Sequence, residues 1–227
     1  METTVRRLHG YTVRGTDGDA GTLSDILFDD ADWRLRYVVA DTGDWVHRRR
    51  VLLTVASLAR IEPAAHAVRV ALTRDQVRHA PSFEADPPVF FRMEHRFRDA
   101  LVLVGAWVAG FNEPYTAHAL VIWTPDGGLM PVHEDDGGDP HLRSAVHMLG
   151  DHVMARDAPA GSLEDFVVES DGWTIKDIVV RTHGWPHHRS VLVSPYWVGR
   201  VSWATCSVFV DLPRSRIEHA GVSGLPA

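Results

Sequence analysis

Residues 10–45 read GYTVRGTDGDAGTLSDILFDDADWRLRYVVADTGDW, and residues 150–185 read GDHVMARDAPAGSLEDFVVESDGWTIKDIVVRTHGW. The two segments match at a constant offset of 140 residues without a gap, and the match continues as far as Val77 and Ile217. Each copy contains two tryptophans twelve residues apart, and their positions coincide at this offset. This pattern indicates a tandem duplication in which the folding unit is about half of the chain.

Each copy is a series of short apolar segments separated by Gly- and Asp-rich turns, which is typical of β-hairpins. The strands expected in the first copy are Tyr11–Arg14, Gly21–Phe28, Trp33–Asp41, Val51–Leu53 and Val68–Leu72. Within the third of these, alternation predicts one face with Trp33, Leu35, Tyr37 and Val39, and an opposite face with Arg34, Arg36 and Val38. A short helix is expected after the last strand, with Thr73 as N-cap and Gln76 completing a capping box.

The predicted fold class is mainly β, with two small antiparallel β-barrels in tandem and a partly helical linker. We expect a first barrel over residues 1–80, a linker over residues 81–140 and a second barrel over residues 141–227. In the linker, residues 89–109 have a helix-compatible spacing, and Tyr115–Thr124 is a candidate strand. Leu129–Pro140 ends in an acidic, Gly-rich stretch and is expected to be an exposed loop. His141–Met148 is expected to be a short helical segment that leads into the second copy.

Composition limits the classes of function. The formal net charge of −7 disfavours a nucleic-acid partner, whose backbone is also negative. The single cysteine, Cys206, excludes an intramolecular disulfide and fits a reducing, cytoplasmic setting. The first residues lack the apolar run of a signal peptide. The apolar stretch Ala100–Gly110 is about half as long as a transmembrane helix, and we expect it to be a buried or interface segment.

The motif residues of the two copies resemble the PRC-barrel domain, which is named after the photosynthetic reaction centre. In the first copy the pattern consists of Gly10, Asp17, Gly21, Leu23, Asp25, Trp33, Leu35, Val38, Val39, Trp45, Val51, Leu52 and Leu53. In the second it consists of Gly150, Asp157, Gly161, Leu163, Asp165, Trp173, Ile175, Ile178, Val179, Trp185, Val191, Leu192 and Val193. The arrangement is similar to bacterial proteins with two tandem PRC-barrels.

The resemblance implies protein docking rather than catalysis. Relatives include the cytoplasmic domain of the reaction-centre H subunit and a ribosome maturation factor whose barrel binds a ribosomal protein. The family has no shared catalytic residues to carry over, and the sequence shows neither a nucleophile elbow nor a phosphate-binding loop. We therefore expect a non-enzymatic docking or scaffold protein with an unidentified protein partner, no cofactor and a possible homo-oligomeric state. The alternatives are a ribosome-assembly or RNA-processing factor and a small-molecule or metal sensor.

Several residues are candidates for interaction or structure. An aromatic and basic surface formed by Trp45, Trp185, Arg48, Arg49 and Arg50 is the first candidate for docking. Solvated turn histidines are the favoured interpretation of His47, His183, His187 and His188, and a metal site is the alternative. Each copy has an aspartate within a strand, Asp25 or Asp165, which we expect to accept structural hydrogen bonds rather than to act as a general base. Structural roles are also expected for Gly21, Gly161, Trp33 and Trp173.

Overall fold

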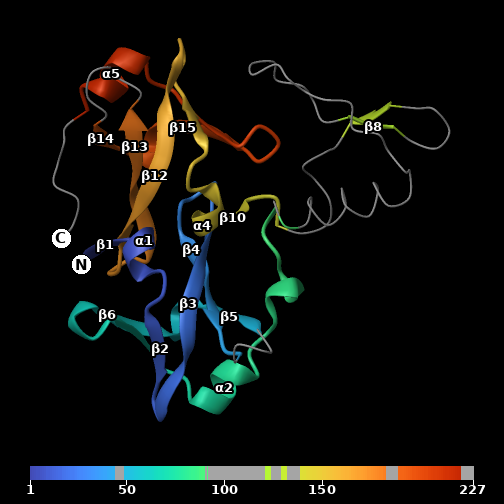
Figure 1. The fold of residues 1–227 in the computed structure, drawn as a ribbon, viewed down its shortest axis with the longest axis vertical. Coiled ribbons are helices and arrows are strands. Elements are labelled where there is room, and N and C mark those ends of the chain that lie inside the picture. The colour runs from blue at the N-terminus through green and yellow to red at the C-terminus, as the bar shows by residue number, and fades with distance from the viewer. Residues whose placement is uncertain are drawn as a thin grey trace.

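The computed structural model describes residues 1–43, 49–89, 91, 121–123, 129–131, 139–182 and 189–220. These residues form two seven-stranded sheets and a separate two-stranded hairpin (Figure 1). In each sheet six strands follow one another in order, and a seventh strand pairs with one of these six. Most of the strands predicted from the sequence are confirmed within one to three residues. No helix among the described residues is both long and apolar enough to cross a membrane.

The first sheet follows the path β5-β4-β3-β2-β7-β6. Its strands are β2 (Thr12–Gly15), β3 (Gly18–Asp29), β4 (Leu35–Asp41), β5 (Arg50–Thr54), β6 (Leu58–Glu62) and β7 (Ala67–Val70). Short helical turns connect or follow them: η1 (Val55–Ser57), η2 (Pro63–Ala65), α2 (Arg74–Arg78) and η3 (Phe83–Ala85). The predicted capping box at α2 is confirmed, since Thr73 Oγ1 accepts from the Gln76 N–H and the Gln76 side chain accepts from the Thr73 N–H.

The second sheet follows the same path with β14-β13-β12-β11-β16-β15. Its strands are β11 (His152–Met154), β12 (Pro159–Glu169), β13 (Thr174–Thr182), β14 (Ser190–Val193), β15 (Val198–Ser202) and β16 (Ser207–Val210). The turn η4 (Pro195–Trp197) precedes β15, and helix α5 (Arg214–Glu218) follows β16. Strands β6 and β15 were not predicted from the sequence. Each sheet also contains one parallel pair, β2 with β7 or β11 with β16, so neither is wholly antiparallel.

A reciprocal exchange of segments joins the two sheets. Strand β1 (Glu2–Thr4) and helix α1 (Val5–Leu8) precede the first sheet, yet β1 pairs with β12 of the second. Strand β10 (Leu142–Ser144) and helix α4 (Ala145–Met148) precede the second sheet, yet β10 pairs with β3 of the first. The register is the same at the 140-residue offset: Thr4 faces Val167, and Ser144 faces Leu27. The exchanged segments lie between the sheets in Figure 1.

One hydrophobic core spans both sheets. Phe28 and Phe166 meet in it with ring centroids 5.3 Å apart, and both rings are fully buried. A second, smaller cluster of Leu27, Val39, Leu52, Phe83 and Leu142 covers the outer face of β3 to β5. Because the larger core takes side chains from both units, the boundaries near residues 80 and 141 do not separate two independent cores.

The predicted alternation of β4 is wrong after its first residue. Leu35 and Val38 pack in the shared core, whereas Tyr37 and Val39 pack in the outer cluster. The cause is a bulge: Leu27 faces Tyr37 while Phe28 faces Leu35, so Arg36 is an extra residue on β4. An extra residue reverses the face of every side chain that follows it.

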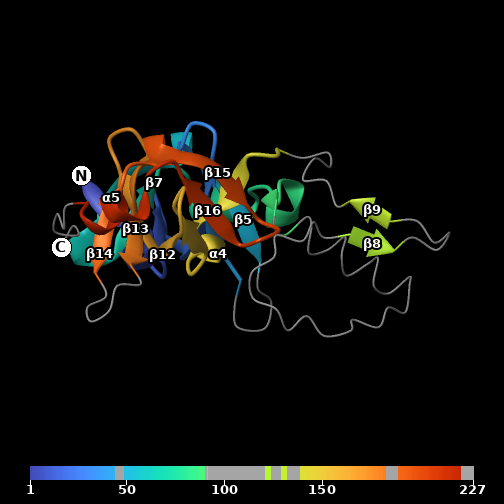
Figure 2. The same ribbon diagram turned by 90° about the horizontal axis from the view of Figure 1, so that it is seen from above.

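The linker is described only in part. Strands β8 (Val121–Trp123) and β9 (Leu129–Pro131) form an antiparallel hairpin to the side of both sheets (Figure 2). The strand expected within Tyr115–Thr124 is therefore present, and the interpretation of Leu129–Pro131 as loop is wrong. His141–Met148, expected to be helical throughout, divides into β10 and α4. Ala100–Gly110 and most of the predicted linker helix lie outside the described residues.

Candidate docking surface

The paired tryptophans Trp33 and Trp173 lie where the two sheets meet. Both have left-handed backbone angles, with φ of 60° and 49°. The Leu35 N–H donates to the Trp173 carbonyl at 2.9 Å, and the Ile175 N–H donates to the Trp33 carbonyl at 2.8 Å. The carbonyl groups of the two tryptophans thus form hydrogen bonds that join the two units. Both tryptophans therefore have a structural role.

The paired aspartates hold the exchanged segments. The Asp25 carboxylate accepts hydrogen bonds from Ser144 Oγ at 2.5 Å and from the Val146 N–H at 3.1 Å. At the matching position, Asp165 accepts from the Arg6 N–H at 3.1 Å. Each aspartate thus binds the first turn of the short helix that comes from the other unit. Burial raises the pKa of Asp25 to about 6, despite hydrogen bonds that favour its charged form.

The paired glycines are required by close backbone contact. A Cβ on Gly161 would lie 2.1 Å from the Arg181 carbonyl oxygen, and a Cβ on Gly21 would lie 2.5 Å from the Asp41 carbonyl oxygen. Neither distance is compatible with a side chain. Each sheet therefore requires glycine where its two longest strands, β3 and β4 or β12 and β13, begin to pair.

The docking surface expected from the sequence is described only in part. Trp45, His47 and Arg48 lie outside the described residues, as do His183, Trp185, His187 and His188. Arg49 is exposed, and its carbonyl accepts from the Thr42 N–H at 2.9 Å. The Arg50 guanidinium lies over the Phe83 ring at 4.0 Å, a cation–π contact that holds the chain after α2 against β5. Arg50 thus contributes to the packing of its own unit.

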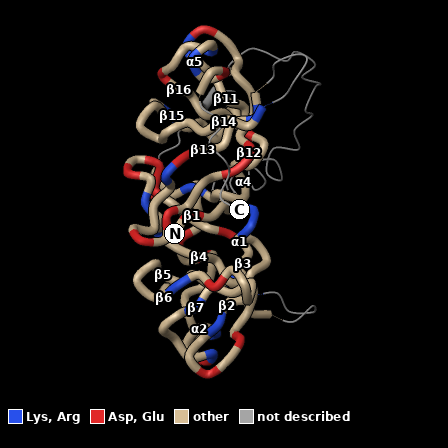
Figure 3. The backbone as a smooth tube through the Cα atoms, turned by 90° about the vertical axis from the view of Figure 1, so that its left-hand side faces the viewer, with Lys and Arg blue, Asp and Glu red and all other residues tan. Residues whose placement is uncertain are grey.

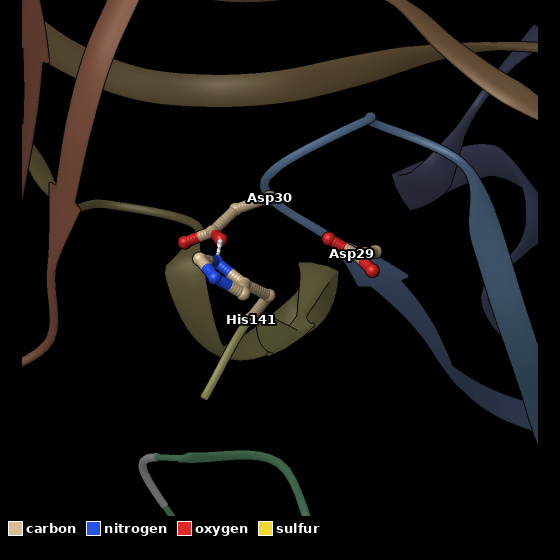
Figure 4. Close-up of side chains that lie close together, drawn as sticks. All are labelled: Asp29, Asp30 and His141. Carbon is tan, nitrogen blue, oxygen red and sulfur yellow. Dashed lines mark hydrogen bonds and ion pairs between the residues drawn. The ribbon is translucent and has the colours of Figure 1, made fainter. Parts of the chain in front are cut away.

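A possible metal-binding group occurs elsewhere among the described residues, where Asp29, Asp30 and His141 bring their ligand atoms within 4.8 Å of one another (Figure 4). The neighbouring cations already neutralise it. Asp29 forms an ion pair with Arg36, and Asp30 accepts from Arg143 Nε at 2.6 Å and from His141 Nδ1 at 2.7 Å. The group is therefore an ion-pair cluster that fastens β10 to the turn after β3.

An aromatic surface that sequence reasoning missed lies on the second unit. Tyr196 and Trp197, in η4, are 84% and 41% exposed, and they are the only large exposed aromatic residues among the described ranges. Their rings meet edge to face at 5.2 Å. Next to this turn, on β15 and β16, the exposed Arg200 guanidinium lies 4.3 Å above the Phe209 ring. We call Tyr196, Trp197, Arg200 and Phe209 the aromatic-cationic patch.

Local structure makes the patch rigid. Pro195 occupies the first turn of η4, the Trp197 N–H donates to the Ser194 carbonyl at 3.0 Å, and the Trp197 carbonyl accepts from the Asp211 N–H at 2.7 Å. A bulge between Val198 and Arg200 turns the arginine outward while Val198 packs toward the core. The backbone that carries these side chains is already held in place by hydrogen bonds, so binding a partner costs little backbone entropy.

The first unit presents different chemistry at the same positions. Tyr196, Trp197 and Phe209 correspond to Ala56, Ser57 and Arg69 at the 140-residue offset. Arg60, the counterpart of Arg200, forms an ion pair with Glu62 at 2.6 Å, but the counterpart of Glu62 is Ser202. The unmatched positions of the two copies single out these residues in the sequence, but not their exposure.

Comparison with known proteins identifies one region of the chain. Residues 2–77 match the family model of the PRC-barrel domain. No curated protein matches the chain. The matched region contains β1 and the first sheet, and a second sheet with the same strand order follows it. The chain therefore carries a PRC-barrel domain at residues 2–77, followed by a second β-sheet unit of the same strand order.

Proposed function

We propose that the protein is a tandem PRC-barrel protein that serves as a non-enzymatic docking module. In this proposal both sheets are barrels of the same family, related by duplication, and the second unit binds a protein partner through the aromatic-cationic patch. The matched strand order and the reciprocal register of β1 and β10 support the common origin of the units.

The observation that carries the docking function is the replacement of Ala56 and Ser57 by Tyr196 and Trp197 in otherwise equivalent turns. The fold of the first unit shows that no large aromatic side chain is needed at this turn. Tyrosine, tryptophan and arginine are also the residue types most enriched among binding hot spots. Exposed aromatic rings without a structural requirement are best explained by a binding role.

Charge indicates the chemistry of the partner. Arg200 has no carboxylate partner among the described residues, because Ser202 replaces the glutamate that pairs with Arg60 in the first unit. The cation lies over the Phe209 ring, an aromatic surface that favours apolar contact. The partner is therefore a protein segment that carries an aspartate or glutamate next to a large apolar side chain.

A ribosome-assembly or RNA-processing role fits the surface less well. Nucleic-acid binding requires a concentration of positive charge, and the net charge of this chain is −7. Among the described residues, basic and acidic segments are interspersed along the backbone in Figure 3. Competition between RNA and peptide ligands distinguishes this role from protein docking.

The test is selection of short random peptides displayed on phage against the full chain, followed by affinity measurements on the selected peptides. We expect acidic residues beside apolar ones to be enriched. Arg200→Glu should weaken binding about tenfold or more, whereas Arg60→Glu, at the matched position of the first unit, should leave binding unchanged. Peptides without acidic enrichment, or equal effects of the two substitutions, would contradict the proposal. Binding of polyuridine RNA that competes with the peptides would favour the RNA-related role.

A further inference from the structure

Most contacts between the two units occur twice, once in each direction. Each sheet accepts a strand and a short helix from the other unit in the same register. Trp33 and Trp173 exchange equivalent backbone hydrogen bonds, and Phe28 packs against Phe166, its own counterpart. A contact that is the same from both sides can form equally well between two copies of one unit. These shared contacts alone therefore do not distinguish a pair of unlike units from a pair of like units.

A buried ion pair at this interface is not repeated. Arg143, on β10, has its Nε 2.6 Å from the carboxylate of Asp30 in the first unit, and both side chains are only 8% exposed. The two junctions have the same register, so Thr3 stands where Arg143 stands and Ser170 stands where Asp30 stands. The second junction therefore has a neutral pair of residues where the first has a charged pair.

Pairing of like units would break this ion pair. Two first units would place Thr3 beside Asp30 and leave a buried carboxylate without its guanidinium. Two second units would place Arg143 beside Ser170 and leave a buried guanidinium without its carboxylate. Removal of one partner of a buried ion pair is strongly unfavourable, because the remaining charge stays out of water. Only a pair of unlike units, which combines one ion pair with one neutral pair, avoids this cost.

The acidic neighbours of Ser170 do not provide an equivalent partner for the arginine. Asp171 is 81% exposed, so an ion pair with it would be solvated and weak. Glu169 corresponds to Asp29, whose own ion pair is with Arg36 on β4. A guanidinium beside Ser170 would therefore meet no carboxylate placed as Asp30 is placed in the first unit.

A second difference between the junctions acts in the same direction. Leu142, on β10, is buried in the outer cluster, where it packs with Leu27 and other apolar side chains of the first unit. Its counterpart on β1 is Glu2, which forms a partly exposed ion pair with Lys176. Pairing of two first units would put Glu2 in the place of Leu142 and bring a carboxylate to an apolar cluster. The first sheet is therefore suited to β10 and not to β1.

We propose that Asp30, Arg143 and Leu142 form a pairing code, which makes the interface between the units specific for unlike units. The partner that the first sheet accepts is then the β10–α4 segment of the second unit, whether or not a linker connects the two. The specificity belongs to the surfaces themselves and survives cleavage of the linker. The aromatic-cationic patch takes no part in it, so the docking function can fail while the pairing code holds, and the reverse.

The experiment removes the covalent link and measures which halves pair. A protease site inserted between Gly137 and Gly138 of the full chain allows the linker to be cut after folding. The two halves should stay together at about 1 µM. After unfolding and refolding of the mixture, native mass spectrometry should find pairs of unlike halves about 100-fold or more in excess over pairs of like halves. Halves that separate on cleavage, or like pairs as abundant as unlike pairs, would overturn the proposal.

The double variant Asp30→Ser with Arg143→Thr tests the code itself. It installs the residues that the second junction already carries, so the variant junction is compatible with the fold. The shared contacts remain and the halves should still associate, but the excess of unlike pairs should fall about tenfold or more. Lys176→Gln, which removes the partly exposed ion pair with Glu2, is the control and should change the excess by less than about threefold. An unchanged excess in the double variant would refute the pairing code.

Co-expression of the two halves as separate chains gives the same ratio without refolding. An affinity tag on one copy of the first half should recover second halves and exclude untagged first halves. With the double variant, the tagged half should recover both kinds of half. Recovery of untagged first halves by the wild-type first half would contradict the proposal.

Discussion

Ser144 Oγ donates a hydrogen bond of 2.5 Å to Asp25, which lies 119 residues earlier in the chain and in the other unit. The same carboxylate accepts the Val146 N–H, so that one buried aspartate satisfies two polar groups of the exchanged segment. The aspartate of the repeated Leu-x-Asp pattern therefore helps to join the two sheets. Its position also explains why an acidic residue interrupts an otherwise apolar strand.

Removing the Asp25 carboxylate should weaken this joint. Asp25→Ala leaves the Ser144 hydroxyl and the Val146 N–H buried without an acceptor, and we expect the free energy of unfolding to fall by about 2 kcal/mol. Asp25→Asn keeps a neutral acceptor of similar shape and should lose much less. Chemical denaturation of both variants measures the difference. An alanine variant as stable as the asparagine variant would show that these hydrogen bonds do not hold the segment.

The stability of the protein should depend on the ionisation of Asp25. Burial raises the pKa of Asp25 in the folded state to about 6, above the value of about 3.9 for an unfolded aspartate. The electrostatic influence of His9 lowers this pKa, but burial has the larger effect. The folded state then binds more protons, so the contribution of this group favours folding at low pH and is lost as the pH rises from about 4 to about 6. Denaturation of the wild type and of Asp25→Asn across this range should show that the wild type loses stability relative to the variant as the pH rises. A difference that does not change with pH would refute the assignment.

The close backbone contacts predict that alanine is not tolerated at the repeated glycines. Gly161→Ala would place a Cβ 2.1 Å from the Arg181 carbonyl oxygen, and separating the strands to relieve this contact should cost about 2 to 3 kcal/mol. Gly172→Ala is the matched control, because the nearest atom to its Cβ would lie at 3.8 Å. Thermal unfolding should show a large decrease in Tm for the first variant and little change for the second. Similar Tm values would contradict the strand geometry.

The shared core predicts that the two units unfold together. Phe28 and Phe166 pack against each other across the sheets, and each sheet contains a strand from the other unit's sequence. Scanning calorimetry of the full chain should therefore give one transition whose calorimetric and van't Hoff enthalpies agree. Two separate transitions would mean that the units are stable without the exchanged segments.

The comparison of sequence and structure shows which features depend on local pattern. The strands bounded by Gly and Asp turns and the Thr73–Gln76 capping box were predicted correctly, because each depends on neighbouring residues. Glu2–Thr4 and Leu142–Ser144 lack an apolar alternation, and they form strands only because the other unit offers an edge. The bulge at Arg36 likewise depends on pairing with β3.

The candidate site was harder to predict than the fold. The sequence comparison at the 140-residue offset favours positions that both copies share, and these are structural: Asp25, Gly21, Trp33 and their counterparts. The patch residues Tyr196 and Trp197 differ from their counterparts and give no periodic signal. Their exposure becomes evident only when the turn η4 is seen outside the shared core.

The central claim, that the second unit docks a protein segment through its exposed aromatic pair, is tested most directly by one affinity ratio. The double variant Tyr196→Ala with Trp197→Ser installs the residues of the first unit and changes two exposed side chains. Peptides selected on the wild-type chain should bind this variant at least about tenfold more weakly while its Tm stays unchanged, because the loss falls on binding hot spots. A dissociation constant equal to that of the wild type would contradict the claim.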